Sequence, residues 1–207
     1  MKKCMQWIGA LLLVALILIG SIRIEPLDSR QTGAFDPTRE VENFWRNELP
    51  KLLQSDRIVE ADLFRNELKL NRKLLIDRYG RTLGIGAPYS LLVGGRFEVI
   101  EVGEELVRLH TEQGAAYDLR IDLLFGNTVR EVSGSFSIDD YENTMDFNHI
   151  AAALNSCVLE RVVAPNAAQL RVGAQLHIVG AVDLASSGEP KACYELIPLH
   201  IEVADHE

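Results

Sequence analysis

Cysteine has the most reactive side chain in this sequence of 207 residues, and it occurs three times. Cys4 precedes a long apolar segment, whereas Cys157 and Cys193 lie in the part of the chain that we expect outside the cytoplasm. Disulfides persist in oxidising compartments, so these two residues are candidates for one. The alternative is a pair of thiols that pack as small apolar side chains. The sequence leaves both alternatives open.

The remaining side chains that bind metals do not have ligand spacing. No two histidines form a close pair, although His177 and His200 fall in separate predicted strands and could become neighbours. Acidic residues gather at 139–146, but they fit neither the glycine nor the glutamate position of a calcium loop. We expect these acids at a helix N-terminus, where the helix dipole stabilises them. The sequence predicts no metal site and no cofactor.

No arrangement of residues indicates catalysis. Gly80, Gly84 and Gly86 are not followed by the Lys-Ser/Thr pair of a phosphate-binding loop. The segment around Ser135 does not match the Gly-x-Ser-x-Gly turn of hydrolases. The protein is therefore predicted not to be an enzyme.

The polar residues Asn143 and Asn155 lie on the best-defined predicted element, a helix over about 138–158. Ser137 is a suitable N-cap. The helix has one apolar stripe: Phe147, Ile150, Ala151, Leu154 and Val158. An amide near a buried stripe must satisfy its donors and its acceptor, so we expect both asparagines to bond to the backbone of segment 126–136 and to clamp it to the helix. Exposure of the two side chains to solvent is the alternative.

The elements around this helix predict an α+β protein. Short strands with turn signals between them are expected over 90–102, 106–110, 117–125, 169–185 and 194–203. Five strands with one inserted amphipathic helix favour a small twisted barrel or a curved antiparallel sheet over residues 79–207. Residues 36–78 are predicted to form a small helical subdomain, in which Pro50 kinks the first helix or divides it into two short helices. Its second helix, over about 56–76, has an apolar side: Val59, Leu63, Leu70 and Leu74.

The N-terminus determines the expected compartment. Lys2 and Lys3 precede an uncharged apolar run over 7–22, so residues 1–24 are predicted to be a membrane anchor or a signal segment. Small residues are poorly spaced for cleavage, which favours an uncleaved single-pass anchor in the bacterial inner membrane. Residues 25–35 are then a tether, and the bulk of the chain is periplasmic. Cleavage would instead give a periplasmic protein.

The net charge of −9 argues against one class of partner. Residues 24–207 hold 18 basic and 30 acidic side chains, a net charge of −12. Such a surface repels phosphate backbones, so nucleic acid is not an expected partner.

The segment 140–155, DYENTMDFNHIAAALN, resembles the signature helix of a bacterial family of predicted periplasmic lipoproteins of unknown function. The positions that carry this resemblance are Asp140, Tyr141, Asn143, Phe147, Ala153, Leu154 and Asn155. Further blocks match in the right order over about 35–203, namely Phe35-Asp36 with Trp45 and Pro50, Tyr79-Gly80 with Pro88-Tyr89, Gly180-Ala181 and Ile197-Pro198. The lipid-attachment cysteine usual in the family is absent here, since Ser21 follows the apolar run. The loop before the helix, 126–134, is shorter than in the family and retains Arg130 alone of its arginine-containing motif.

The resemblance implies a helical subdomain, an OB-like β-barrel and an association with ATP-dependent sugar uptake systems. We therefore expect an envelope-anchored periplasmic accessory or binding protein, whose partners are the inner membrane and either transporter components or a small polar ligand. The candidate ligand- or partner-binding residues are Arg130, Asp140, Asn143 and Asn155. A carboxylate-dependent enzyme acting on an envelope carbohydrate and a purely structural scaffold are the alternatives.

Overall fold

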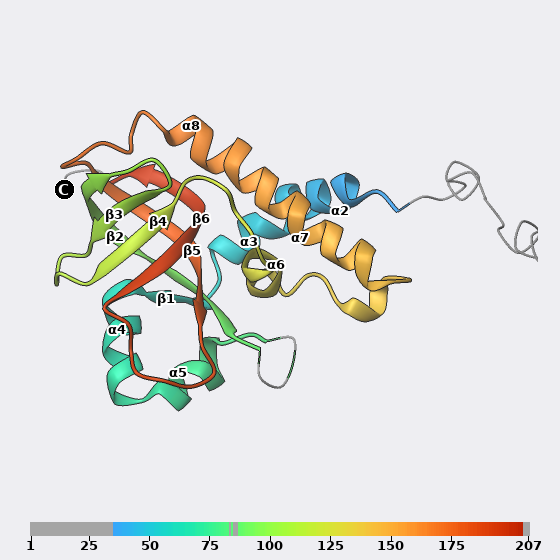
Figure 1. Cartoon of the computed structure of the whole chain (residues 1–207), viewed down its shortest axis with the longest axis horizontal. Helices are drawn as coiled ribbons and strands as arrows, with labels where there is room; N and C mark the ends of the chain where they lie inside the picture. The colour runs from blue at the N-terminus through green and yellow to red at the C-terminus, as the bar shows by residue number, and fades with distance from the viewer. Residues whose placement is uncertain (1–34, 83, 85–86, 205–207) are drawn as a thin grey trace, which may run out of the picture. The chain divides into compact units, whose positions relative to one another are not determined.

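A computed structural model of the protein describes residues 35–82, 84 and 87–204, and residues 36–207 form one compact unit. Its centre is a closed β-barrel (Figure 1). The predicted anchor, residues 1–24, and all of the tether except Phe35 lie outside the described residues. Within the described part of the chain, no helix is long and apolar enough to cross a membrane.

Five strands form the barrel, in the order β2-β3-β4-β6-β5, and β5 pairs with β2 to close it. The strands are β2 (Tyr89–Val102), β3 (Leu106–His110), β4 (Ala116–Arg120), β5 (Gln175–Leu184) and β6 (Cys193–Val203). All neighbours are antiparallel except β4 and β6, which are parallel and are connected through the helical insertion and β5. The prediction of five strands is confirmed, and closure through the β2–β5 pairing decides for the barrel over the open sheet.

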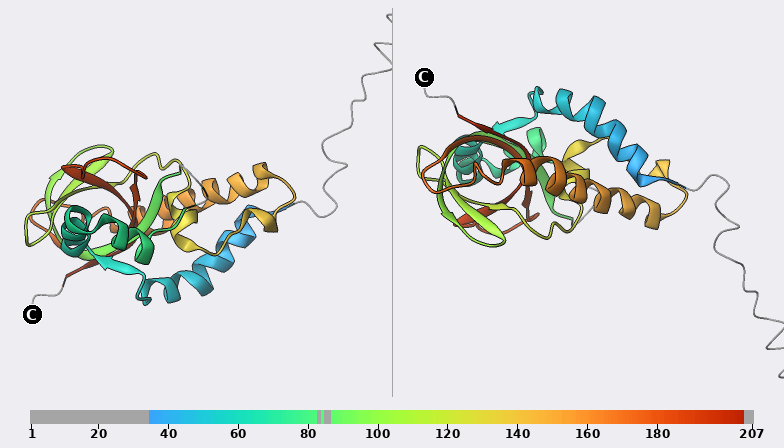
Figure 2. Two further views of the ribbon diagram at one scale, coloured as in Figure 1. Left: turned by 90° about the horizontal axis from the view of Figure 1, so that it is seen from below. Right: turned by 90° about the horizontal axis from the view of Figure 1, so that it is seen from above.

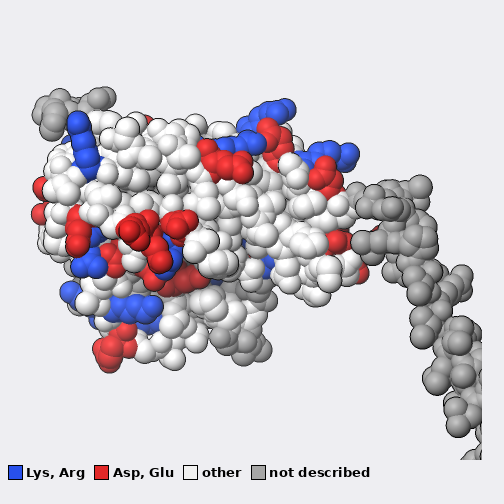
Figure 3. Space-filling model, turned by 45° about the horizontal axis from the view of Figure 1, so that its top comes forward, with Lys and Arg blue, Asp and Glu red and all other residues white. Residues whose placement is uncertain are grey.

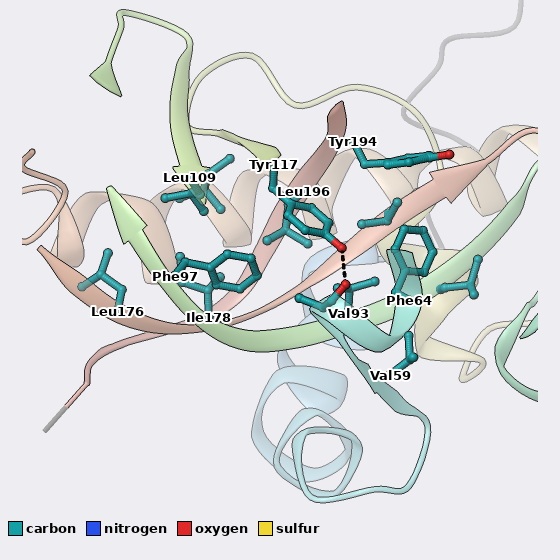
Figure 4. Packing of buried hydrophobic residues seen from close by; sticks show 14 of the residues in the cluster. Val59, Phe64, Val93, Phe97, Leu109, Tyr117, Leu176, Ile178, Tyr194 and Leu196 are labelled. Atoms are coloured by element: carbon teal, nitrogen blue, oxygen red, sulfur yellow. Dashed lines mark hydrogen bonds between the residues drawn. The ribbon is translucent and has the colours of Figure 1, made fainter. Parts of the chain in front are cut away.

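Alternation along the strands fills the barrel with apolar side chains (Figure 4). Phe97 and Tyr117 meet edge to face, with ring centroids 5.4 Å apart. The Tyr117 hydroxyl donates to the carbonyl oxygen of Ala61 at 2.7 Å, which satisfies the one polar atom that this side chain buries. Burial raises the pKa of Tyr117 far above its ordinary value, so the hydroxyl stays protonated and keeps its role as a donor.

Residues 36–78 do not form a subdomain of their own, because their two halves pack on different parts of the molecule (Figure 2). The first half is a continuous helix made of α2 (Pro37–Asn43), a π-helical turn η2 (Phe44–Glu48) and α3 (Leu49–Leu53). Its α2 segment lies alongside the long helix α7. Where the sequence predicts a kink or two short helices at Pro50, the structure has two short α-helices joined by the wider π turn just before it. That turn places Pro50 in the first turn of α3, where its missing N–H costs little.

The second half begins with a strand, not with the predicted helix. β1 (Ile58–Glu60) pairs in parallel with β2, and α4 (Ala61–Leu70) and α5 (Arg72–Tyr79) follow it on the barrel surface. The predicted apolar side was also wrong: Leu63, Leu70 and Leu74 are exposed. The helices instead bury Phe64, Leu68 and Leu75.

Between β4 and β5 lie α6 (Thr128–Ser133), a 3-10 turn η3 (Ile138–Asp140) and α7 (Thr144–Val158), which continues through the π turn η4 (Leu159–Val163) into α8 (Ala164–Asn166). The predicted stripe of α7 is buried as expected. The predicted start was too early, because Ser137 caps η3 and Asn143 caps α7. The extended backbone of Tyr141 separates these two starts.

Candidate functional site

Helix α6 is fixed to the barrel by one carboxylate. Asp183 of β5 accepts from the Ser90 hydroxyl of β2 at 2.5 Å and from the Thr128 hydroxyl at the start of α6 at 2.7 Å. The barrel seam and the first residue of α6 therefore share one anchor point.

The same segment is clamped to α7 on its other side. Asn155 donates through Nδ2 to the carbonyl oxygen of Gly126 at 3.1 Å, and Arg130 donates through Nη1 to the carbonyl oxygen of Phe147 at 2.7 Å. Asn155 thus makes the backbone contact that the sequence predicts, whereas Asn143 caps its own helix by accepting from the Asp146 N–H at 2.9 Å. Helices α6 and α7 pack directly against each other, and both clamp residues are therefore buried.

A groove opens on the side of α6 that faces the connection from α5 to β2. It encloses about 620 Å³, within the usual size range of small-ligand sites. Four arginines line it, and we call it the arginine groove. Its lining consists of Arg57, Arg78, Tyr79, Gly80, Arg81, Thr82, Arg130, Glu131, Gly134, Phe136, Ser137 and Ile138.

Arg57 and Arg81 approach each other beside the C-terminus of α6. Arg57 donates to the carbonyl oxygens of Val132 at 2.5 Å and of Ser133 at 3.2 Å, where the helix dipole favours a cation. The Arg81 guanidinium lies over Gly134: a Cβ there would come within 3.0 Å of Arg81 Cζ. Gly134 has φ +64°, which favours glycine, and its missing side chain leaves room for the Arg81 guanidinium. Burial, and next the positive charge of Arg81, lower the pKa of Arg57.

The backbone holds Arg81 in place. Arg81 pairs with Ser90 as an isolated antiparallel bridge, through N–H to carbonyl bonds of 3.0 Å and 2.7 Å. Its side chain therefore extends from a fixed point toward the groove. Arg78 lies one residue before Tyr79, and its guanidinium stands 5.1 Å from that ring centroid.

In the part of the chain that the structure describes, no carboxylate lies within ion-pair distance of Arg57, Arg78 or Arg81. Some basic side chains elsewhere do have an acidic partner, as in the 2.7 Å contact of Arg108 with Asp118. Figure 3 shows basic and acidic side chains lying next to each other on the face that it draws. The arginine groove therefore concentrates uncompensated positive charge in an acidic protein, which favours an anion.

Arg130 forms the floor of the groove and is 2% exposed. Its guanidinium stacks 3.6 Å above the Phe147 ring and pairs with Glu131 at 3.2 Å. Burial lowers the pKa of Arg130 and raises the pKa of Glu131, whereas the contact between them opposes both shifts. The charge of Arg130 is matched by Glu131, so Arg130 shapes the groove, whereas Arg57, Arg78 and Arg81 have no ion pair among the described residues and supply its charge.

The structure thus brings one predicted site residue, Arg130, into the groove. Asp140 lies beside it and accepts from the Ser137 N–H at 3.4 Å in a capping box. Sequence reasoning missed Arg57, Arg78 and Arg81. Only Arg78 and Arg81 could have been noticed in the sequence, because they lie on either side of the Tyr79-Gly80 pair that carries the family resemblance.

Of the two alternatives for Cys157 and Cys193, the structure has free thiols. Cys157 lies on α7, and Cys193 lies at the start of β6 beside Asp118. Burial raises the pKa of both thiols, that of Cys193 to about 11 with help from its hydrogen bond to Asp118.

We therefore expect both thiols to react slowly with a maleimide at neutral pH, because the thiolate is the reactive form. At pH 8 the Cys193 thiolate should be about 100-fold scarcer in the folded protein than in urea, where its pKa returns to 9.0. The rate should rise with pH up to about 11. Peptide-resolved mass spectrometry without reductant measures each thiol separately. Recovery of a Cys157–Cys193 peptide pair would contradict the expectation.

The two sheet histidines do become neighbours, around Glu202 of β6. His177 Nδ1 lies 3.6 Å and His200 Nε2 3.2 Å from the two oxygens of that carboxylate. They belong to a second hollow, between the barrel and the helix that carries Trp45. The expectation that His177 and His200 could become neighbours is thus met, with the Glu202 carboxylate between them.

The closed five-stranded barrel, its helical insertion before β5 and the parallel β4–β6 pair define an OB-fold protein. Solved structures of similar fold include an OB-fold protein of Thermotoga maritima, with a TM-score of 0.74 and 24% sequence identity, over 83% of this chain and 99% of that one. At this identity the likeness shows the fold alone. None of the curated proteins matches the sequence.

The family model of the predicted periplasmic lipoproteins, domain of unknown function 2291, matches residues 12–202. The chain belongs to this family, which confirms the resemblance found in the sequence. Membership supports a periplasmic location for the protein.

Proposed function

We propose that this protein is an envelope-anchored periplasmic binding protein whose arginine groove takes a small anionic ligand, with a carboxylate or phosphate group. The observation that carries the proposal is the convergence of Arg57, Arg78 and Arg81 without an acidic partner among the described residues. Guanidinium groups bind carboxylates and phosphates through paired hydrogen bonds. An anion would also offset the positive charges that Arg57 and Arg81 bring together; burial, and next the charge of Arg81, lower the pKa of Arg57.

We include the N-terminal anchor in this proposal. Its support is the uncharged apolar run over 7–22 behind Lys2 and Lys3, together with membership in a family of predicted lipoproteins. An association with sugar uptake transporters, implied by the resemblance, is a further prediction. Affinity purification from membranes in mild detergent tests it, and consistent absence of transport components would refute it.

A carboxylate-dependent enzyme is less well supported by this groove. Glu131 is the only acid among its described lining residues, and it already pairs with Arg130. Glycoside hydrolysis generally needs two carboxylates that face each other across the bond. Binding without chemical change is the simpler use of this site.

Titration calorimetry on the detergent-solubilised full chain tests the groove, with inorganic phosphate, glucuronate and glucose as probes. We expect the two anions to bind and glucose not to bind. Arg81→Gln should weaken anion binding about 10- to 100-fold, the cost of one charged hydrogen-bonding partner. Arg81 is exposed, so this variant should remain folded.

Arg96→Gln is the matched control, since Arg96 is also an exposed arginine but lies on β2 outside the groove. It should bind the anions like the wild type. Equal binding of glucose, or an equal loss in both variants, would refute an anion site in the groove.

A further inference from the structure

The exposed side of α4 and α5 combines leucines with basic residues, and we call residues 61–81 the leucine–lysine face. Leu70 is 75% exposed, Leu74 61% and Leu63 43%. Leu63 and Leu70 lie seven residues apart in α4, on one side of that helix, and Leu74 lies in α5 after the break at Asn71. The fold buries the opposite side of the same helices, so the leucines are available for an outside partner.

The charge of this face is opposite to that of the protein. Its exposed basic side chains outside the arginine groove are Lys69 and Lys73, and its only exposed acid is Asp77. The chain beyond residue 23 has a net charge of −12. Leucines flanked by lysines are typical of helices that lie in the headgroup region of a bilayer.

Hydrogen bonds connect both helices to the loop before β6, so the exposed side chains of this face have a defined arrangement. Arg65 donates to the carbonyl oxygens of Lys191 at 2.8 Å and Ala192 at 2.9 Å. Arg72 donates to those of Gly188 and Ala185 in the same loop. Both guanidinium groups face the protein, which leaves the outer side to the lysines and leucines.

The position of the face in the fold agrees with an outside partner. Helices α4 and α5 lie on the side of the barrel away from α7 and α8 (Figures 1 and 2). The eleven residues 25–35 reach at most about 36–40 Å when extended. This exceeds the length of the helix over 37–53, about 25 Å. A tether of this length allows the domain to turn this face toward the bilayer that holds the anchor.

We propose that the leucine–lysine face docks on an anionic phospholipid bilayer, with Leu70 and Leu74 inserted and Lys69 and Lys73 on the headgroups. The inference rests on the anchor of the proposed function, which keeps a membrane within reach. It gives the domain a defined orientation: one side rests on lipid, and the helix pair of α2 and α7 stays clear of it.

The test uses the full chain with its native cysteines replaced by alanine and an environment-sensitive fluorophore on Leu70→Cys or Leu74→Cys. The protein is reconstituted in vesicles of phosphatidylcholine alone or with phosphatidylglycerol. At 70 and 74 we expect a blue shift, and quenching by spin-labelled lipid, only with phosphatidylglycerol. Phe125→Cys and Met145→Cys are the control sites, 75% and 66% exposed and elsewhere on the fold.

The double variant Lys69→Gln/Lys73→Gln should lower the ratio of docked to undocked protein about 30-fold, from two lost lysine–headgroup contacts. The control pair Arg46→Gln/Lys51→Gln, two exposed cations on the first helix, should leave it unchanged.

Each outcome that differs from these expectations contradicts one specific part of the proposals. Fluorescence at 70 and 74 that stays water-like in both vesicles, or that matches the control sites, overturns the docking inference. If the full chain does not float with either kind of vesicle in a density gradient, the proposed N-terminal anchor is wrong. Loss of anion binding by Arg81→Gln is measured separately, so the groove and the docking face can fail independently.

Discussion

Replacing Arg130 by methionine is expected to lower the free energy of unfolding by about 3–5 kcal/mol, the usual cost of leaving one partner of a buried pair alone. Arg130 is 2% exposed and bonds to Glu131 and to the carbonyl oxygen of Phe147. Methionine fills much of the space but leaves the Glu131 carboxylate without its cation. Urea unfolding of the two proteins measures the difference.

The loss should depend on pH, and the sign follows from Glu131. Burial raises the pKa of this acid in the folded state, so the folded protein binds its proton more readily than the unfolded chain does. Its contribution to stability is therefore most favourable below pH 4.5 and declines as the pH rises through the folded pKa. Without Arg130 the pKa of Glu131 should rise further, so its contribution to stability should decline over a wider pH range. The variant should therefore lose more stability at pH 7 than at pH 4.

Two controls separate the buried pair from a general effect of losing an arginine. Adding Glu131→Gln to Arg130→Met should recover part of the stability and remove the extra pH dependence. Arg46→Met removes an arginine from an exposed pair and should cost about 0.5 kcal/mol or less. Equal losses in the Arg130 and Arg46 variants would show that the buried pair contributes no more than a surface pair.

Local sequence patterns predicted the barrel strands well, because period-two alternation and turn residues are read within a few positions. The buried stripe of α7 was found for the same reason: its apolar residues recur at helical spacing. What local patterns could not settle is closure, since the β2–β5 pairing joins residues about ninety positions apart. The OB-like topology came from the family resemblance.

The helical pattern over 56–76 shows where such reasoning fails. Leu63, Leu70 and Leu74 have the same spacing as a core stripe, and so do Phe64, Leu68 and Leu75. Periodicity alone cannot decide which of two apolar sides meets the barrel. In the structure Phe64 contacts Tyr194 edge to face, and the leucines remain outside.

The candidate site was predictable in part only. Arg130 was found through the resemblance, and the backbone bond of Asn155 through the expectation that a buried amide donates to a carbonyl oxygen. The same expectation fails for its Oδ1, which has no hydrogen-bond partner among the described residues. Arg57 belongs to the turn before β1 and reaches α6 across 76 positions, a contact that no local motif encodes. The groove is therefore a product of tertiary packing.

Gly180→Ala is expected to cost about 1–3 kcal/mol, as overpacking of a tight core usually does. Gly180 lies at the irregularity of the β5–β6 register, beside the strand that closes the barrel. A Cβ there would stand 2.6 Å from the carbonyl oxygen of Ile197 and 2.8 Å from Cγ of Leu196. A backbone oxygen of the partner strand cannot move without shifting the ladder, so the seam itself must adjust.

Two other glycines provide a graded comparison in urea unfolding. At Gly94 the Cβ would stand 2.8 Å from Cγ2 of Ile58, a methyl group and not a backbone atom, so alanine should cost less there than at Gly180. At Gly84 nothing lies within 4 Å, and alanine should change stability by about 0.5 kcal/mol or less. The expected order of destabilisation is Gly180, then Gly94, then Gly84. A neutral Gly180→Ala would mean that the β5–β6 seam yields, and that barrel closure does not depend on this close approach.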